Sequence, residues 1–133
     1  MNSRYPQVAA QANHACEYCH APEWVFNFPL EVEHIVPVCR GRLNELNNLA
    51  LSCRSCNLRK GTHTQFLDPI TKREVSLFHP RTMQWHNHFS VNSGTGEIEG
   101  KTAIGRGTVL VLQINSANQL KARKLWVKLG LFP

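Results

Sequence analysis

The chain has 133 residues, of which 42% are hydrophobic and 18% are charged, a balance typical of one globular domain and not of a disordered chain. No apolar run approaches the roughly 18 residues of a membrane-spanning helix, and residues 1–12 hold no apolar stretch of signal-peptide length. We therefore expect a single domain over residues 1–133, with no membrane partner, in a reducing, cytoplasmic compartment where five cysteines do not form a disulfide framework.

The net charge of +6 is unevenly distributed along the chain. Residues 1–35 carry a net charge of −3, residues 36–60 carry +4 and residues 61–133 carry +5. A basic chain of this kind favours a polyanionic partner, and nucleic acid is the commonest one. A generic basic surface that serves solubility is the alternative.

Four of the five cysteines form two C-x-x-C pairs, Cys16 with Cys19 and Cys53 with Cys56. Two such pairs can complete a tetrahedral thiolate site, for which zinc is the default metal and iron the alternative. A redox pair, or two unrelated buried pairs, would be the other explanation. Cys39 is left over, and we interpret it as a thiol that is not a ligand. The 33 residues between Cys19 and Cys53 exceed the roughly 15–20 of simple zinc ribbons, so the metal is expected to hold the base of a sizeable insert.

The insert between the cysteine pairs predicts a strand, a loop, a strand and a helix. Residues 30–37 alternate polar and apolar side chains and end at a proline, as a strand would. A loop rich in asparagine follows, and Leu49–Leu51 form a second, apolar strand. Residues 54–60 then predict a short helix, with Ser52 as its N-cap and a glycine after its last residue.

Several residues of this insert carry reactive groups. Glu33 and Asn57 offer carboxylate and amide oxygens, which are hard ligands suited to Mg²⁺ or Mn²⁺. His34 could take a proton from water near neutral pH, and Lys60 lies on the face of the helix that carries Asn57. These are the groups that metal-assisted hydrolysis of a phosphodiester requires.

One geometric difficulty accompanies this assignment. Neighbouring residues of a regular strand point to opposite faces, so Glu33 and His34 can serve one phosphate only if the strand twists, bulges or ends there. Glu31 lies on the same face as Glu33 and is the alternative metal ligand.

The pattern resembles the HNH endonucleases, the ββα-metal nuclease family. The matching elements lie within residues 14–63, less than half of the chain, and are Cys16-x-x-Cys19, Glu33-His34-Ile35-Val36-Pro37, Asn48-Leu49 and Cys53-x-x-Cys56-Asn57-x-x-Lys60.

The resemblance implies a role for each matching residue. His34 would be the general base that activates water, and Asn48 would hold the histidine loop in position. Glu33 and Asn57 would bind one catalytic Mg²⁺ or Mn²⁺, and Lys60 would approach the phosphate. Products in such families carry 5′-phosphate and 3′-hydroxyl ends.

The sequence departs from the commonest family pattern at two of these positions. The ligand before the histidine is Glu33, where Asp is commoner, and the helix position is Asn57 instead of His. His63 is the alternative for that position if the helix is placed differently.

The second half of the chain carries less chemistry. Residues 85–91 alternate as a strand and residues 92–96 predict a hairpin turn. Residues 105–108 predict a basic turn, and residues 108–114 predict a strand, with a short helix capped by Thr108 as the alternative. Residues 117–129 predict a final helix with Ser116 as its N-cap.

The final helix has two predicted faces. Its core-facing stripe would hold Ala122, Leu125, Trp126 and Leu129. The other face carries Lys121, Lys124 and Lys128, which are either solvated or a clamp for a DNA backbone. His79, His86 and His88 would be the ligands of a second metal site, an alternative that lacks a further acidic or thiol ligand.

Together these observations predict an α+β fold. Its ββα-metal core would be stapled by structural Zn²⁺ on the four paired cysteines, with residues 64–133 as a C-terminal α/β extension. The expected function is an Mg²⁺- or Mn²⁺-dependent endonuclease that acts on DNA as a monomer or weak dimer, and RNA remains an open alternative substrate. The predicted phosphate contacts are Arg40, Arg42, Arg59 and Lys60. A zinc-ribbon module that binds nucleic acid without cutting it is the competing function.

Overall fold

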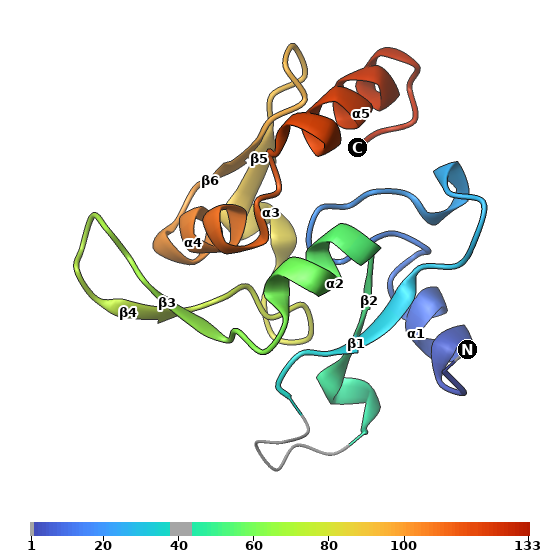
Figure 1. The fold of residues 1–133 in the computed structure, drawn as a ribbon, viewed down its shortest axis with the longest axis horizontal. Coiled ribbons are helices and arrows are strands. Elements are labelled where there is room, and N and C mark those ends of the chain that lie inside the picture. Colours follow the sequence, from blue (N-terminus) through green and yellow to red (C-terminus); the bar gives the residue numbers. More distant parts are fainter. Residues whose placement is uncertain (1, 38–43) are drawn as a thin grey trace.

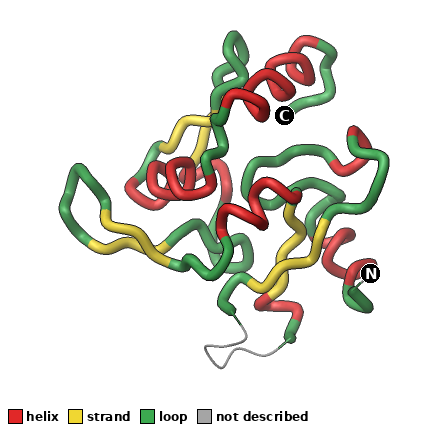
Figure 2. The backbone as a smooth tube through the Cα atoms, in the orientation of Figure 1, coloured by secondary structure: helices red, strands yellow, loops and turns green. Residues whose placement is uncertain are grey.

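The computed structural model describes residues 2–37 and 44–133, so the predicted phosphate contacts Arg40 and Arg42, and Cys39, lie outside the described residues. Within that part of the chain the fold is α+β, with short helices around three separate two-stranded antiparallel sheets (Figures 1 and 2). The elements in chain order are α1 (Tyr5–Gln11), η1 (Glu23–Val25), β1 (Glu31–His34), η3 (Leu46–Asn48), β2 (Leu49–Ser52), α2 (Arg54–Lys60), β3 (Gln65–Leu67), β4 (Glu74–Ser76), α3 (Trp85–His88), β5 (Phe89–Val91), β6 (Ile98–Gly100), α4 (Ala103–Leu112) and α5 (Ala117–Lys128).

The strand, strand and helix predicted between the cysteine pairs are confirmed. β1 and β2 pair as an antiparallel hairpin in which Glu31 lies opposite Ser52 and His34 lies opposite Leu49. The predicted N-cap of α2 is wrong by one residue, because Ser52 is the last residue of β2. Cys53 caps the helix instead, with its Sγ accepting from the N–H of Cys56 at 3.5 Å.

The four paired cysteines converge on one point in the fold. Their sulfur atoms lie within 4.8 Å of one another, and the Sγ atoms of Cys19 and Cys53 are 3.8 Å apart. Tetrahedral zinc with Zn–S bonds of about 2.3 Å places its sulfur ligands about 3.8 Å apart, so the cluster fits the predicted structural zinc. Among the described residues it is the one group of three or more His, Cys, Asp or Glu able to share an ion, and His79, His86 and His88 form no such group.

Protonation of the cluster without metal differs from one thiol to the next. Burial opposes ionisation of Cys16, but hydrogen bonds from the other three cysteines hold its pKa well below the usual value. The pKa values of Cys19 and Cys56 are raised, chiefly by hydrogen bonds that make their thiols the donors. Zinc binding must therefore displace protons from this cluster, which couples metal binding to folding.

The strand predicted over residues 85–91 is only partly correct. Residues 85–88 form one helical turn, α3, and only Phe89–Val91 form a strand, which pairs with β6. The indole of Trp85 donates to the carbonyl of Tyr18 at 2.9 Å and its ring stacks on His20 at 3.8 Å, contacts that hold α3 against the first cysteine pair. Distant contacts thus override the local alternation of polar and apolar residues.

The predicted turn at residues 105–108 and the predicted strand at 108–114 are wrong, because both lie in or beside helix α4. Thr102, not Thr108, caps this helix, with its Oγ accepting from the N–H of Gly105 at 3.1 Å. A Cβ on Gly105 would lie 2.1 Å from the carbonyl oxygen of His88, and one on Gly107 would lie 1.8 Å from the ring of Phe66. The two glycines therefore serve close packing of a helix and not a flexible turn.

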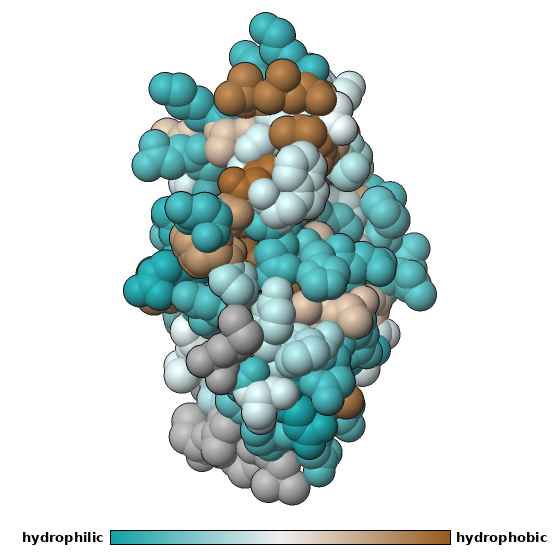
Figure 3. Space-filling view, turned by 90° about the vertical axis from the view of Figure 1, so that its right-hand side faces the viewer, coloured by the Kyte–Doolittle hydropathy of each residue, from teal (hydrophilic) through white to brown (hydrophobic). Residues whose placement is uncertain are grey.

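Helix α5 begins after Ser116 as predicted, but its buried face differs from the predicted stripe. Leu125 and Leu129 are 55% and 62% exposed, whereas Arg123 is 2% exposed. Apolar side chains gather on the part of the surface over α5 (Figure 3). Arg123 replaces an apolar residue in the core because its guanidinium donates to the carbonyls of Gly96 and Ile114.

The hydrophobic core joins the two halves of the chain. It includes Leu49, Ala50 and Leu51 of β2, the two cysteine pairs, and apolar residues from the second half such as Leu77, Phe78 and Leu112. None of the helices in the described ranges has both the length and the apolar character needed to cross a membrane.

The close approach of Gly105 to the carbonyl of His88 predicts that Gly105→Ala destabilises the protein, whereas helix propensity alone would predict stabilisation. Gly105→Ala adds about 1 kcal/mol of helix propensity, but the backbone clash with His88 should cost more, leaving a net destabilisation of about 1–2 kcal/mol. Urea denaturation of the zinc-loaded protein measures this. Gly94→Ala is the control, because its Cβ would meet only a side-chain oxygen of Asn92 at 3.4 Å. A Gly105→Ala variant as stable as wild type would contradict the packing of α4.

If the sulfur cluster is a structural zinc site, replacing one of its cysteines should remove the zinc and the folded state together. We expect Cys53→Ser to lose zinc and cooperative unfolding, since a structural zinc site stabilises small peptides by roughly 10 kcal/mol or more. Metal analysis and circular dichroism on the same preparation measure both. Cys39→Ser is the control and should keep the zinc stoichiometry of wild type. A Cys53→Ser variant that is zinc-free and well folded would show that the cluster is not a structural metal site.

Candidate active site

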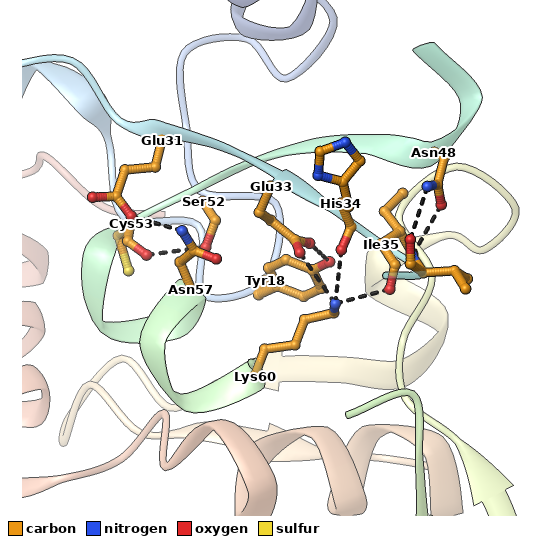
Figure 4. Close-up of polar contacts among 11 residues, drawn as sticks. Tyr18, Glu31, Glu33, His34, Ile35, Asn48, Ser52, Cys53, Asn57 and Lys60 are labelled. Carbon is orange, nitrogen blue, oxygen red and sulfur yellow. Dashed lines mark hydrogen bonds and ion pairs between the residues drawn. The ribbon is translucent and has the colours of Figure 1, made fainter. Parts of the chain in front are cut away.

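Three of the predicted site residues, Glu33, His34 and Asn57, line one groove between β1 and α2, and Asn48 does not line it. The groove has a volume of about 390 Å³ and is lined by Val32, Glu33, His34, Pro37, Asn57, Gly61 and Thr62. Glu33, His34 and Asn57 are thus brought together, although Glu33 and His34 point to opposite sides of the strand (Figure 4). Side chains from both faces of the strand reach the groove, because the consecutive residues Val32, Glu33 and His34 all line it.

His34 is the last residue of β1, and its ring is partly exposed. Its Nε2 lies 3.1 Å from Oδ1 of Asn44. An amide oxygen can only accept, so Nε2 carries the proton in this pair and Nδ1 of the neutral ring is the acceptor. Nδ1 is therefore the ring nitrogen that is able to take a proton from water.

Asn48 joins the two ends of the loop that follows His34. Its Oδ1 accepts from the N–H of Val36 and its Nδ2 donates to the carbonyl of Val36, both at 2.9 Å (Figure 4). Its own carbonyl accepts from the N–H of Ile35 at 2.9 Å. These bonds anchor the chain directly after the histidine, at the position where the resemblance expects Asn48 to act.

Glu33 is 5% exposed and is held by two buried side chains. The hydroxyl of Tyr18 donates to its Oε1, and the ammonium of Lys60 donates to its Oε2 at 3.1 Å. Burial raises the pKa of Glu33, while the charge of Lys60 and the hydrogen bond from Tyr18 oppose that rise. Burial and the neighbouring carboxylate raise the pKa of Tyr18 well above its usual value, so its hydroxyl remains a donor.

Asn57 and Glu31 form a second polar pair beside Glu33. The Nδ2 of Asn57 donates to Oε1 of Glu31 at 2.7 Å, and Arg54 donates to Oε2 of Glu31 at 3.0 Å. The side-chain oxygen of Asn57 makes no hydrogen bond with any residue that the structure describes, so it is the amide atom available to a ligand. His63, the alternative to Asn57, is exposed and does not line the groove.

The structure places the predicted phosphate contacts Arg59 and Lys60 differently from the sequence-based expectation. Lys60 is 1% exposed, and its ammonium donates to Glu33 and to the carbonyls of His34 and Ile35. Arg59 donates to the corner between α4 and α5, through Gln113 O, Ser116 Oγ and Gln119 Oε1. Both cations are therefore committed to contacts within the protein.

Sequence reasoning missed two residues of this site, Tyr18 and Asn44, and one contact, that of Glu31 with Asn57. Tyr18 lies within the first cysteine pair, Cys-Glu-Tyr-Cys, and is buried in the structure. Neither its partner nor that of Asn44 follows from spacing, because these contacts depend on how the hairpin packs.

A larger cavity of about 590 Å³ lies elsewhere, between the end of α1, the first cysteine pair and residues 78–85. Its polar wall holds an ion pair between Glu17 and Arg81, and Glu17 also accepts from the N–H of Leu51 at 2.9 Å. None of the residues predicted to carry chemistry in the insert lines it, so its size does not make it the candidate active site.

Comparison with known proteins identifies a family for part of this chain. Residues 16–63 match the family described as HNH endonuclease. The Septu protein PtuB of Bacillus thuringiensis is 30% identical over 111 residues, which cover 82% of this chain and 40% of that protein. This chain thus spans less than half the length of that relative. No solved structure matches this chain. The matched range contains both cysteine pairs and every residue that lines the groove, and residues 16–63 therefore form an HNH endonuclease family domain.

Proposed function

We propose that this chain is a metal-dependent endonuclease that hydrolyses phosphodiester bonds of DNA, with His34 as the general base. The observation that carries this proposal is the convergence of Glu33, His34 and Asn57 on one groove within an HNH family domain. An imidazole beside a carboxylate and an amide oxygen is the donor set expected for metal-assisted hydrolysis.

The groove fits a hard divalent cation such as Mg²⁺ or Mn²⁺. An ionised carboxylate has about four acceptor positions, of which Tyr18 and Lys60 occupy two on Glu33. The side-chain oxygen of Asn57 supplies a second oxygen donor, because its Nδ2 is already used by Glu31. When bound, the ion would stabilise the negative charge that develops on the phosphorane and on the leaving 3′ oxygen.

The chain's own residues would supply the proton chemistry. In the proposed reaction, Nδ1 of His34 takes a proton from water as the water oxygen bonds to phosphorus. The bond from phosphorus to the 3′ oxygen then breaks and this oxygen takes a proton from solvent water, which leaves a 5′-phosphate and a 3′-hydroxyl. Asn44 would fix the tautomer of His34, and Asn48 would keep the backbone beyond His34 in place.

Replacing the base tests the proposal directly. We expect His34→Ala to lower the rate of plasmid nicking in Mg²⁺ or Mn²⁺ by about 10²–10⁴-fold, the usual contribution of a general base. Zinc content and the unfolding midpoint should stay close to wild type, because the ring of His34 is partly exposed.

His63→Ala is the matched control, since this histidine is exposed just beyond α2 and outside the groove. Full nicking activity in His34→Ala would remove His34 as the base. Absence of nicking in wild type, with DNA binding retained, would favour the non-catalytic binding module.

The two carboxylates of β1 can be assigned by conservative substitutions. Glu33→Gln removes the charge of the proposed ligand, and we expect the Mn²⁺ concentration that gives half-maximal nicking to rise at least about 10-fold. Glu31→Gln keeps an oxygen that accepts from Asn57, so the same quantity should change less than about 3-fold. Unfolding midpoints of both variants check that each is folded. The opposite order of effects would assign the metal to Glu31, the alternative ligand.

A further inference from the structure

We propose that Tyr18 and Lys60 are positioning residues of the groove, which hold the Glu33 carboxylate and the end of β1 in place. Both side chains belong to segments that carry cysteines of the sulfur cluster. This inference rests on the proposed function, because it concerns how the proposed ligand Glu33 and the proposed base His34 are held.

The first step is the geometry of the network. Tyr18, Glu33 and Lys60 are 0%, 5% and 1% exposed, and each carboxylate oxygen of Glu33 accepts from one of the other two side chains (Figure 4). An ammonium has three donors, and those of Lys60 reach Glu33 Oε2, the carbonyl of His34 at 3.1 Å and the carbonyl of Ile35 at 2.8 Å. Lys60 thus fixes the Glu33 side chain and the main chain of His34 together.

The second step is the origin of these two supports. Tyr18 lies between Cys16 and Cys19, and Lys60 is on α2, the helix that contains Cys56 and begins directly after Cys53. Both side chains therefore project from segments whose positions the sulfur cluster determines. Any ion that orders the cluster also sets where the hydroxyl of Tyr18 and the ammonium of Lys60 stand relative to β1.

The third step concerns energy. Moving an ion pair out of water costs several kcal/mol per ion, and apolar side chains of similar volume usually stabilise a fold as well or better. A buried Glu33–Lys60 pair is therefore poorly explained as a device for stability. What the pair does provide is a fixed orientation of the Glu33 carboxylate, since hydrogen bonds hold both of its oxygens where it lines the groove.

The test compares two tyrosines that each donate to a glutamate. Tyr18→Phe removes the hydroxyl that binds Glu33, and Tyr5→Phe removes the hydroxyl that binds Glu23 at 2.6 Å, outside the groove. In zinc-loaded protein we would measure Mn²⁺ binding by electron paramagnetic resonance, then kcat and half-saturating Mn²⁺ for plasmid nicking. Zinc content and urea denaturation would be measured on the same samples.

We expect Tyr18→Phe to keep its zinc and to weaken Mn²⁺ binding about 10-fold or more, the usual effect of losing a partner behind a metal ligand. Tyr5→Phe should leave Mn²⁺ affinity and kcat within about 2-fold of wild type, because its glutamate does not line the groove. Equal Mn²⁺ affinity and equal kcat in Tyr18→Phe and wild type would overturn the inference, even if the variant is less stable.

Lys60→Met provides a second variant, since it keeps the length of the side chain and removes the ammonium. If it folds with zinc bound, we expect lower Mn²⁺ affinity and lower kcat than in Tyr18→Phe, because three contacts are lost instead of one. Wild-type values of both quantities would overturn the role of Lys60. If Lys60→Met does not fold, the result of Tyr18→Phe decides.

The Mn²⁺ measurement separates this inference from the proposed function. If wild type binds Mn²⁺ in the groove but nicks no DNA, the nuclease proposal fails, while weaker binding by Tyr18→Phe still supports the positioning role. If zinc-loaded wild type binds no Mn²⁺ at all, both proposals are overturned.

Discussion

The convergence of four sulfur atoms is the constraint on which the rest of this structure depends. It joins Cys19 to Cys53 across 33 intervening residues, and the hairpin of β1 and β2 lies within that span. Cys53 also caps α2, so the cluster sets where the helix begins as well as how it lies against the hairpin. A groove between a two-stranded sheet and a helix of seven residues has little secondary structure to support it. The stabilisation must come from outside the elements that form it, and a structural metal site is a strong local source of it.

The part of the fold that follows from the sequence is the part that short-range rules control. Residues 54–60 form the predicted helix and Gly61 ends it as expected, although Cys53 caps it in place of the predicted Ser52. Residues 108–114 misled the analysis, because an apolar, β-branched run fits a buried strand and a buried helix equally well. What decides is the close approach of α4 to the carbonyl of His88, which only Gly105 permits. Arg123 illustrates the same limit, since its burial depends on backbone carbonyls that the chain brings together only once folded.

The candidate site likewise has features that the sequence predicts and features that depend on how the chain packs. Spacing predicted that Glu33, His34 and Asn57 lie near one another, and in the structure all three line one groove although Glu33 and His34 point to opposite sides of β1. Spacing could not identify Lys60 as buried, because lysine is almost never fully buried unless a partner compensates its charge. Its partner, Glu33, lies 27 residues away in sequence. A pairing of this kind is set by how α2 packs on the hairpin, so it appears only in the folded chain.

The contacts of Lys60 and Arg59 also change the interpretation of the net positive charge of residues 36–60. Residues 36–60 carry a net charge of +4 in the sequence, yet Lys60 is neutralised by Glu33, Arg54 is paired with Glu31, and Arg59 is bonded to the α4–α5 corner. A count of the positive side chains in this segment therefore overstates the free positive charge at the groove, because Lys60 and Arg54 are each paired with a glutamate, whereas Arg59 keeps its charge but is directed to the α4–α5 corner. Under the proposed function, the divalent cation would supply attraction for the scissile phosphate that Lys60 and Arg59 do not supply directly. The buried lysine would serve that cation indirectly, by keeping the carboxylate that faces it in one orientation.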